Sequence, residues 1–297
     1  MTASVIILVL LSALFHAFWN YLSKVSYSPQ LFLAWVAIIN IAISIAVFLV
    51  RTPVIPSSIW VYIIASGIVH FFYLASLSQA YTSGEISYVY PIARSAPGLI
   101  PIFAALILHE KISWQGVLGI SCTLVSVYMF IQPEGLYTLP KLLEYLKKPE
   151  AIWSFSTLGT IIVYSILDKK GMTEFYNEVG GSDIVNAVVY LLAESLLSSI
   201  LYVVYVVYHF PWREIITIGK QSGTQIFIST LLKISSYSLI LYALMTESVS
   251  YISAIRQFSV IFVVLLGGLN LGESQLKLRL IAGTTMVIGI FLIAISN

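Results

Sequence analysis

The sequence predicts an all-α integral membrane protein with ten transmembrane helices, arranged as two inverted five-helix repeats around a central cavity. Three observations lead to this expectation: an apolar composition, ten apolar segments of membrane-spanning length, and an ordered similarity between the two halves. Of the 297 residues, 59% are hydrophobic and only 9% are charged, whereas a soluble domain devotes about a quarter of its residues to charge. Too few polar residues remain to cover a soluble core, so the bilayer must be part of the solvent.

Charge and cysteine content exclude several other classes. The net charge is only +2 and the basic residues are scattered, so the basic stripe of a nucleic-acid-binding protein is missing. Cys122 is the single cysteine, which rules out an internal disulfide and a cysteine-rich metal site. We therefore expect no nucleic acid partner, no metal and no cofactor.

The first apolar segment, "MTASVIILVLLSALFHAFWN", is expected to be a membrane span. It lacks the basic start and the small-residue cleavage site of a signal peptide. A span needs about 20 mostly apolar residues, and such segments are too long and too continuous for barrel strands. The template fits at residues 3–22, 31–50, 58–81, 87–108, 113–131, 151–167, 184–208, 223–245, 249–270 and 276–295.

The longest polar stretch, residues 132–150, divides the chain near its midpoint. We expect a first repeat over 1–131, a connecting loop over 132–150 and a second repeat over 151–297, each repeat with five spans. Within the loop, "LPKLLEYLKKP" has the pattern of a short amphipathic helix lying at the membrane surface.

The two halves match when the sequence is shifted by 163 positions. The shift gives seven identities between residues 80–110 and 243–273. Ser87 and Tyr88 pair with Ser250 and Tyr251 at the start of a span. These polar matches do not follow from apolar composition and indicate an internal repeat.

An odd number of spans in each repeat means that the second repeat enters the membrane in the opposite sense to the first. The repeats are therefore expected to be inverted. Inverted repeats with a site at their interface recur in secondary transporters, in which the two bundles move against each other around a site near the midplane.

Several segments resemble a known family. The stretch "ALFHAFWNYLSK" at the end of the first span, the loops in "LILHEKISWQGVLGI" and "LNLGESQLKLRLIAG", and the five-plus-five layout resemble the EamA-type members of the drug/metabolite transporter superfamily. The resemblance covers essentially the whole chain. It implies ten helices in two repeats around a central cavity, commonly lined by the first, third, fourth, sixth, eighth and ninth helices.

The resemblance also implies that both termini lie in the cytoplasm. With both termini in the cytoplasm, only four loop cations would face the cytoplasm and eight would face away. The positive-inside rule therefore favours the reverse orientation. The four are Arg51, Lys111, Lys169 and Lys170, and the eight are Lys24, Lys141, Lys147, Lys148, Arg213, Lys220, Lys277 and Arg279. Membrane orientation therefore stays open.

Four charged residues are expected within the spans. A charge at the centre of a membrane helix costs about 2.5 to 3.5 kcal/mol on insertion scales, so each needs a partner or a function. They are Arg94, Glu194, Lys233 and Arg256. Arg94 lies among three prolines, which remove backbone donors and predict a kinked or broken span there.

We expect Arg94, Lys233 and Arg256 to bind an anionic group of a substrate. Arginine forms bidentate hydrogen bonds with phosphate or carboxylate, and lysine acts as a point charge. The shift pairs Lys233 with His70 and places Arg256 one position from the counterpart of Arg94. Sugar-phosphate translocators of the same superfamily use basic residues in this way, so the resemblance agrees. The alternative is that Glu194 neutralises one cation in an ion pair that fixes helix packing.

Weaker signals add further candidates. His16, Trp19 and Asn20 share one face of the first span, either as a cavity wall or as a polar clasp between helices. Tyr88 and Tyr251 lie at the start of their spans. We expect them either to bind substrate or to lie at the membrane interface, where aromatic residues are enriched. Glu110 and Glu273 follow spans four and nine, where we expect them to cap the next helix.

His70 and Glu194 are candidates for proton coupling. Histidine titrates near neutral pH, and burial can bring a glutamate into the same range. The alternative for His70 is a hydrogen-bonded packing role.

No catalytic constellation is visible, and the glycines in "GTTMVIG" and "GGLNLGE" suit close helix packing better than phosphate binding. We expect no enzyme. The residues and the resemblance together predict a secondary transporter of a small, anionic metabolite in the cell membrane, as a monomer or homodimer. Alternatives are an exporter of neutral or amphipathic metabolites such as amino acids, and a structural membrane protein.

Overall fold

The structure is a computed structural model that describes residues 3–51, 53–99, 113–131, 139–179, 184–247, 252 and 255–295. Throughout these residues the chain forms helices and no strands. The first half contains α1 (Ala3–Val25), α2 (Pro29–Arg51), η1 (Ser57–Ile59), α3 (Trp60–Ser83), α4 (Ile86–Ala93) and α6 (Trp114–Ile131). The second contains α7 (Leu139–Leu146), α8 (Pro149–Val179), α9 (Ile184–His209), α10 (Trp212–Thr246), α12 (Phe258–Asn270) and α13 (Leu276–Ile295).

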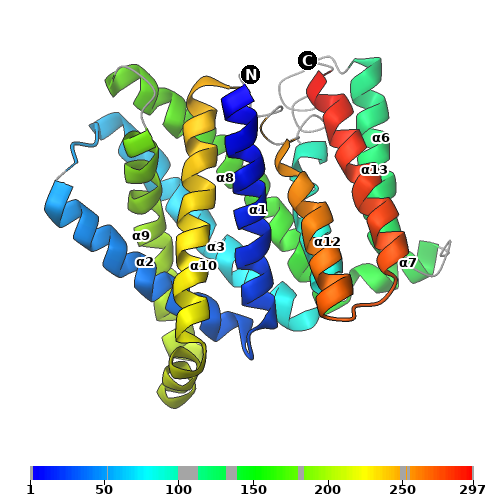
Figure 1. Cartoon of the computed structure of the whole chain (residues 1–297), viewed down its shortest axis with the longest axis horizontal. Coiled ribbons are helices and arrows are strands. Elements are labelled where there is room, and N and C mark those ends of the chain that lie inside the picture. The colour runs from blue at the N-terminus through cyan, green and yellow to red at the C-terminus, as the bar shows by residue number, and fades with distance from the viewer. Residues whose placement is uncertain are drawn as a thin grey trace.

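Eight of these helices are long and apolar enough to cross a membrane: α1, α2, α3, α6, α8, α9, α10 and α13. α12 is apolar but shorter. The helices run up and down, and the two ends of the chain lie at the same end of the bundle (Figure 1). We call this the terminal end and the other the opposite end.

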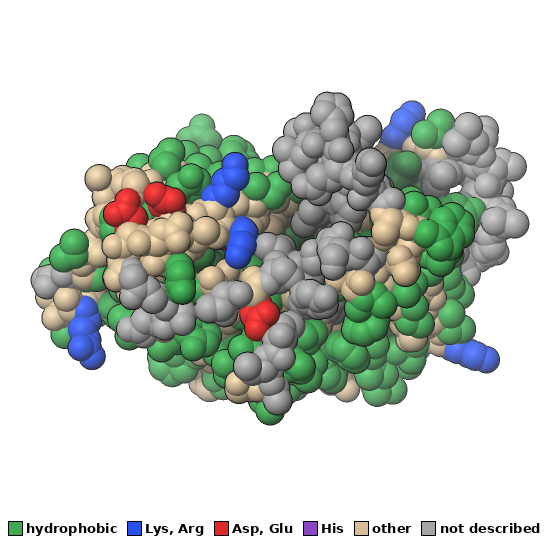
Figure 2. Space-filling view, turned by 90° about the horizontal axis from the view of Figure 1, so that it is seen from above, with side chains coloured by type: hydrophobic (Ala, Val, Ile, Leu, Met, Phe, Trp, Pro, Cys, Tyr) green, Lys and Arg blue, Asp and Glu red, His purple; other side chains and the backbone are tan. Residues whose placement is uncertain are grey.

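Apolar side chains cover the outside of the helices. Exposed examples occur on the long helices, such as Leu49 on α2, Phe72 on α3 and Phe291 on α13. Figure 2 views the terminal end, where hydrophobic side chains dominate the rim. Large exposed apolar surface of this kind marks a membrane or interaction surface, and on helices of spanning length it fits a lipid environment.

The long helices pack in pairs that join the two halves of the chain. α6 packs against α13, α2 against α9, and α4 against α12, while α3 packs against α8 and α1 against α10. The exchange of each helix with its counterpart in the other half replaces α1 with α8, α2 with α9, α3 with α10, α4 with α12 and α6 with α13, and the reverse. This exchange leaves the pairs α6–α13, α2–α9 and α4–α12 unchanged, and it converts the α3–α8 pair into the α1–α10 pair.

Two glycines allow α6 and α13 to approach closely. A Cβ added to Gly119 would lie 2.4 Å from the backbone oxygen of Gly289, and one added to Gly289 would lie 2.6 Å from that of Gly119. Small residues at such crossings bring helix backbones together in membranes. Both glycines are therefore required by packing.

The predicted break in span four is present. α4 ends at Ala93, and Arg94 follows with φ −87° and ψ 1°, which interrupts the helix. Pro91 lies inside α4 and Pro97 follows the turn, so the missing backbone donors explain the interruption. The remainder of this predicted span, from residue 100 onward, lies outside the described residues.

Span nine is interrupted at the matching position. α12 begins at Phe258 after a turn at Gln257, and the shift of 163 pairs Gln257 with Arg94. No proline occurs near Gln257, so the sequence did not predict this second break.

Span six is longer than expected: it was expected over 151–167, but α8 continues to Val179. Span eight was expected over 223–245, and although α10 begins at Trp212, it is kinked at Ser222 (φ −118°, ψ 16°), directly before the expected start. The predicted amphipathic segment forms α7. Polar residues beyond an apolar run can stay helical, because backbone hydrogen bonds do not depend on hydrophobicity.

Candidate functional site

A cavity with several polar and charged side chains in its wall lies inside the bundle, between α1, α2, α3, α8, α9 and α10. About 40 Å³ of it is open to the centre of a water molecule, which is space for a few waters. Its lining residues are His16, Trp19, Asn40, His70, Tyr73, Leu74, Tyr164, Leu191, Glu194, Ser195, Ser198, Lys233, Ile234, Ser236, Tyr237 and Arg256. Polar groups that converge in an enclosed site are the usual mark of ligand binding.

Six of the residues singled out from the sequence line this cavity: His16, Trp19, His70, Glu194, Lys233 and Arg256. They come from both halves of the chain. His70 and Lys233, which the shift pairs with each other, both line this one cavity.

Arg94 and Arg256 lie among tyrosine rings. The guanidinium carbon of Arg94 is 5.6 Å from the centre of the Tyr90 ring, and that of Arg256 is 5.5 Å from the Tyr237 ring. Cation–π contact of this kind stabilises a buried cation by about 0.5 to 2 kcal/mol. Arg94 is 5% exposed and is not among the residues that line the cavity.

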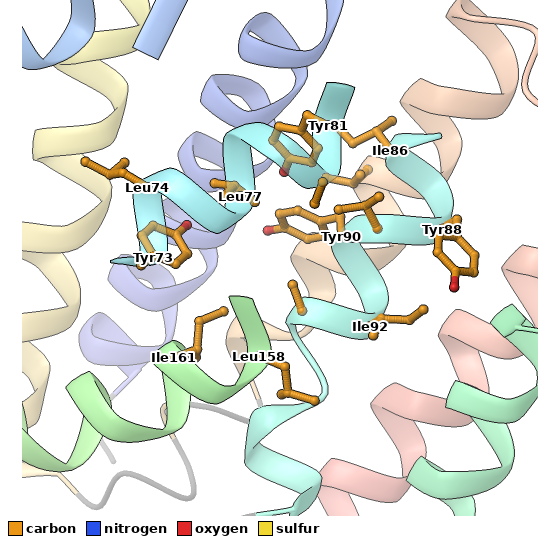
Figure 3. Packing of buried hydrophobic residues seen from close by; sticks show 14 of the residues in the cluster. Tyr73, Leu74, Leu77, Tyr81, Ile86, Tyr88, Tyr90, Ile92, Leu158 and Ile161 are labelled. Atoms are coloured by element: carbon orange, nitrogen blue, oxygen red, sulfur yellow. The ribbon is translucent and has the colours of Figure 1, made fainter. Parts of the chain in front are cut away.

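Both arginines retain unpaired donor atoms. Arg94 Nη2 and Arg256 Nε are buried and have no hydrogen-bond partner within the described part of the chain. Tyr73 lies within electrostatic reach of both guanidinium groups. Figure 3 shows the hydroxyls of Tyr73, Tyr81 and Tyr90 pointing toward a common region between α3 and α4. Two buried cations with unpaired donor atoms therefore lie close to a group of tyrosine side chains.

His70 and Glu194 form a buried pair across α3 and α9. His70 Nδ1 lies 3.0 Å from Glu194 Oε2, and the His70 ring stacks on Tyr164 at 4.1 Å between centroids. The contact with Glu194 lacks hydrogen-bond geometry, so among the described residues neither carboxylate oxygen of Glu194 has a hydrogen-bond donor. The partner of Glu194 is thus a histidine at contact distance, with Lys233 acting on it electrostatically.

Asp168 is a fifth charged residue inside the bundle and was missed in the sequence. The expectation of four such residues was wrong because span six was ended at residue 167, whereas α8 continues beyond it. Asp168 is fully buried. It accepts hydrogen bonds from Ser66 Oγ at 2.5 Å, Tyr190 Oη at 3.2 Å and the hydroxyl of Tyr237.

We call His70, Asp168, Glu194, Lys233 and Arg256 the central cluster. The charged groups of this region are the cations Arg94, Lys233 and Arg256 and the anions Asp168 and Glu194. With both histidines neutral, the described charges sum to +1.

His16, Trp19 and Asn20 are divided between cavity and packing. The His16 ring stacks on Trp19 with centroids 5.2 Å apart, and both line the cavity. Asn20 is fully buried, donates to His16 Nδ1 at 2.6 Å and accepts from the Tyr81 hydroxyl at 2.6 Å. Its polar atoms hold α1 against α3, which is the clasp that we considered as an alternative.

Tyr88 lies away from the central cavity. It lines a surface pocket at the opposite end together with Tyr145 and Arg279, and its side chain points away from Tyr90 (Figure 3). Its predicted counterpart, Tyr251, lies outside the described residues, as do Ser250 and Glu110.

A second charged group lies at the opposite end of the bundle. We call Glu85, Ser87, Glu273 and Arg279 the end cluster. Glu273 accepts from the backbone N–H groups of Ile86 at 2.8 Å and Ser87 at 2.9 Å, and from the Ser87 hydroxyl. Arg279 pairs with Glu85 and lies 3.6 Å from Glu273 Oε2.

The expectation that Glu273 caps the helix after it was therefore wrong. Its carboxylate caps the first turn of α4, 187 residues earlier in the chain, because the loop before α13 lies against the start of α4. Orphan N–H groups at a helix start attract an acceptor from any nearby element.

Residues 3–132 match the model of the EamA-like transporter family. The resemblance drawn from the sequence is thereby confirmed for the first half of the chain. No curated protein matches the sequence. A crystal structure described only as that of a protein aligns with 98% of this chain and 98% of its own, at 18% identity and a TM-score of 0.59, which shows a shared fold.

The eight apolar helices of spanning length indicate a multi-pass integral membrane protein. Residues 3–132 are similar to a family of transporters.

Proposed function

We propose that this protein is a secondary transporter that moves a small metabolite bearing a phosphate or carboxylate group by alternating access. One observation carries the proposal: the buried guanidinium groups of Arg94 and Arg256 each keep a donor atom without a partner among the residues that the structure describes. A buried donor left unpaired destabilises the fold by about 1 to 3 kcal/mol, and more for charged groups. An anionic ligand would supply the missing acceptors.

The chemistry of the cavity favours a phosphate or carboxylate group. A planar guanidinium group matches either group with two parallel hydrogen bonds. Lys233 adds a flexible ammonium group in the same wall. Stacked rings such as His16 and Trp19 would contact the less polar body of the substrate.

Alternating access rests on the proposed ten spans in two inverted repeats. The exchange symmetry of the helix pairs supports this arrangement. α3 ends at Ser83 and α10 at Thr246, which are equivalent under the shift of 163. Gly84 and Glu247 then cap these helices with equivalent bonds to the carbonyls of Ala80 and Ala243.

A lysine serves each of these two helix ends as well. Lys24 of α1 donates to the carbonyl of Tyr81 at 2.7 Å, and Lys169 of α8 donates to that of Leu244 at 2.8 Å. Tyr81 and Leu244 are equivalent under the same shift. Because the two ends lie on opposite sides of the bundle (Figure 1), the device is repeated upside down, as inverted repeats require.

A second candidate is an exporter of zwitterions such as neutral amino acids. Glu194 favours it, because this buried carboxylate lines the cavity beside Lys233 and Arg256 and has no hydrogen-bond donor in the described chain. A zwitterion would place its carboxylate on the cations and its ammonium group on Glu194.

Ligand-dependent stability of the purified protein separates the candidates, since a ligand that binds only the folded state raises the unfolding temperature. The panel is glycerol 3-phosphate, succinate, glutamate, threonine and glucose. We expect the first three to stabilise the protein. Stabilisation by threonine alone would select the zwitterion exporter, and stabilisation by glucose alone would overturn both readings.

The residues are tested by Arg94→Ala, Lys233→Ala and Arg256→Ala, which should each remove the stabilisation by glycerol 3-phosphate. Arg213→Ala is the matched control, because Arg213 is exposed at the start of α10 and its loss should change nothing. If all three cavity variants retain wild-type stabilisation, the anion site is wrong.

Alternating access is tested by thiol labelling in a Cys122→Ser background, which removes the single native cysteine. Ser195→Cys and Ser198→Cys place a thiol in the cavity wall. We expect a membrane-impermeant thiol reagent to label these positions from either side of a vesicle. Labelling from one side only under all conditions would favour a structural protein.

A further inference from the structure

A chain of close polar contacts leads from the cavity to Asp168. Glu194 lines the cavity and contacts His70 Nδ1. The same nitrogen lies 3.1 Å from Ser66 Oγ, and Ser66 Oγ donates to Asp168 Oδ1 at 2.5 Å. The path thus passes through two carboxylates, an imidazole and a hydroxyl, all of which can carry or relay a proton.

Both ends of the path are enclosed. Asp168 and Glu194 are fully buried, and His70 is 12% exposed in its side chain. Glu194 has no hydrogen-bond donor on either oxygen within the described residues, although it lies in the cavity wall. A carboxyl group in the cavity wall whose oxygens have no donor among these residues can exchange a proton with water in the cavity.

Asp168 is also connected to the proposed anion site. The Tyr237 hydroxyl donates to Asp168, and the Tyr237 ring lies beneath the guanidinium group of Arg256. A change of charge on Asp168 therefore acts on Arg256 through one side chain.

The groups facing the path come from five elements. They are Ser66 and Tyr73 of α3, Tyr164 of α8, Tyr190 of α9, Lys233 and Tyr237 of α10, and His16 of α1, together with Arg94 and Arg256. Lys233 acts electrostatically on Glu194 from the same cavity wall.

We propose that Asp168 is the proton-carrying group of this protein and receives its proton from the cavity through Glu194, His70 and Ser66. In the transfer, the Glu194 carboxyl O–H bond breaks as an N–H bond forms at the unprotonated Nδ1 of His70, whose other ring nitrogen already carries a proton. The same proton then moves from Nδ1 to Ser66 Oγ as the Ser66 hydroxyl proton moves to Asp168 Oδ1. The net result is one proton moved from Glu194 to Asp168, with His70 and Ser66 restored.

Charge balance then couples the proton to the anion. With both carboxylates ionised the central charges sum to +1, and a proton on Asp168 raises the sum to +2. A dianion such as a phosphate monoester is matched only by the second state, and an uncompensated buried charge is expensive. One proton therefore accompanies each dianion, and this step rests on the proposed transport function.

The first test needs no substrate. Infrared difference spectra of the purified protein, taken during acidification, should show the carbonyl band of a buried carboxylic acid. The band should disappear in Asp168→Asn and persist in Glu178→Gln, a matched control because Glu178 is exposed on the same helix. A band that survives Asp168→Asn but disappears in Glu194→Gln overturns the assignment to Asp168, and so does the absence of any band.

The second test separates coupling from transport in proteoliposomes that contain glycerol 3-phosphate, with the membrane potential clamped to zero. Wild-type protein should exchange labelled glycerol 3-phosphate and should accumulate it up to about tenfold per unit of pH gradient for one coupled proton. Asp168→Asn should keep exchange and lose the accumulation. Loss of the Ser66 relay in Ser66→Ala should slow accumulation but not exchange.

The outcomes distinguish the two proposals. Wild-type exchange that ignores the pH gradient overturns proton coupling and leaves the transport proposal standing. Absence of exchange contradicts the transport of this anion class, and the infrared test then decides on Asp168 alone. If Asp168→Asn does not fold, Tyr237→Phe removes one hydrogen bond to Asp168 and should shift the band to higher pH, because it stabilises the ionised form less. An unshifted band in that variant also counts against Asp168.

Discussion

The central cluster and the end cluster use the same residue types in opposite ways. In the end cluster, the Glu273 carboxylate receives two backbone N–H groups and the Ser87 hydroxyl, and Arg279 contacts Glu85, Ser87 and Glu273. In the central cluster, Glu194 and Arg256 keep polar atoms with no hydrogen-bond partner in the described structure. Charges that are satisfied by the protein hold it together, whereas charges that are left unsatisfied are available to a ligand.

The largest expected effect comes from breaking the satisfied cluster. Glu273→Ala leaves the start of α4 uncapped and Arg279 without one of its carboxylates. Removal of one partner from a buried pair destabilises a protein by about 3 to 5 kcal/mol. We expect a loss of that size in the free energy of unfolding, measured by denaturant titration in detergent.

Glu144→Ala is the control for this variant. Glu144 is exposed on α7, so its removal should leave stability nearly unchanged. Equal stability of the Glu273→Ala protein and the control would mean that the end cluster does not hold the bundle closed.

The next largest effect is expected in the central cluster, where the loss of a cation should weaken ligand binding without lowering stability. Arg256→Ala should weaken binding of glycerol 3-phosphate by about 30-fold or more, since truncating one member of a buried charge pair costs about 2 kcal/mol or more in affinity. Without ligand, the unfolding temperature should stay unchanged or rise, because an uncompensated cation is removed. Isothermal titration and thermal unfolding on one sample measure both.

A loss of stability in Arg256→Ala comparable to that in Glu273→Ala would erase the distinction between the two clusters. Arg256→Lys keeps the positive charge and removes the planar fork, so it should recover only part of the affinity.

A third, smaller effect concerns the shape of the guanidinium group in the end cluster. Arg279 donates to the Ser87 hydroxyl and to Glu85 from separate nitrogens, which a lysine cannot do in the same geometry. Arg279→Lys should therefore lower the free energy of unfolding by about 1 to 2 kcal/mol, measured as for Glu273→Ala. Wild-type stability would show that charge alone suffices at this end.

The sequence predicted the helical class, the break beside Arg94 and several lining residues, because these follow from local signals. Runs of apolar residues identify helices by length, prolines identify the break, and the cost of an intramembrane charge identifies functional candidates. The shift of 163 also brought His70 and Lys233 together as equivalent positions, and both line the cavity.

Asp168 and the role of Glu273 were not predictable in the same way. Asp168 is followed by Lys169 and Lys170. This run of charged residues predicts the end of a membrane span, and the sequence alone does not show that the helix continues beyond it. The partners of Glu273 are set by a loop that meets α4 from the other half of the chain. Contacts between such distant segments depend on the packing of the whole bundle, and one sequence contains no record of them.

The smallest expected effects concern the two lysines at the helix ends. Lys24→Met and Lys169→Met each remove an ammonium group that donates to carbonyls at the end of α3 or α10. Because both lysines are only partly buried, each variant should lose about 1 kcal/mol in the free energy of unfolding. The loss should be larger for Lys24, which serves the carbonyls of both Tyr81 and Gly84.

Lys170→Met is the matched control, since Lys170 is exposed beside Lys169 on α8. It should leave stability unchanged in denaturant titration. Comparable losses at Lys24 and Lys169 would support one capping device used at both ends of the bundle, as expected for inverted repeats. A loss of stability at Lys24 alone would instead indicate that Lys24 acts together with the end cluster. Lys169, which follows Asp168 of the proton path, would then have no role in stability.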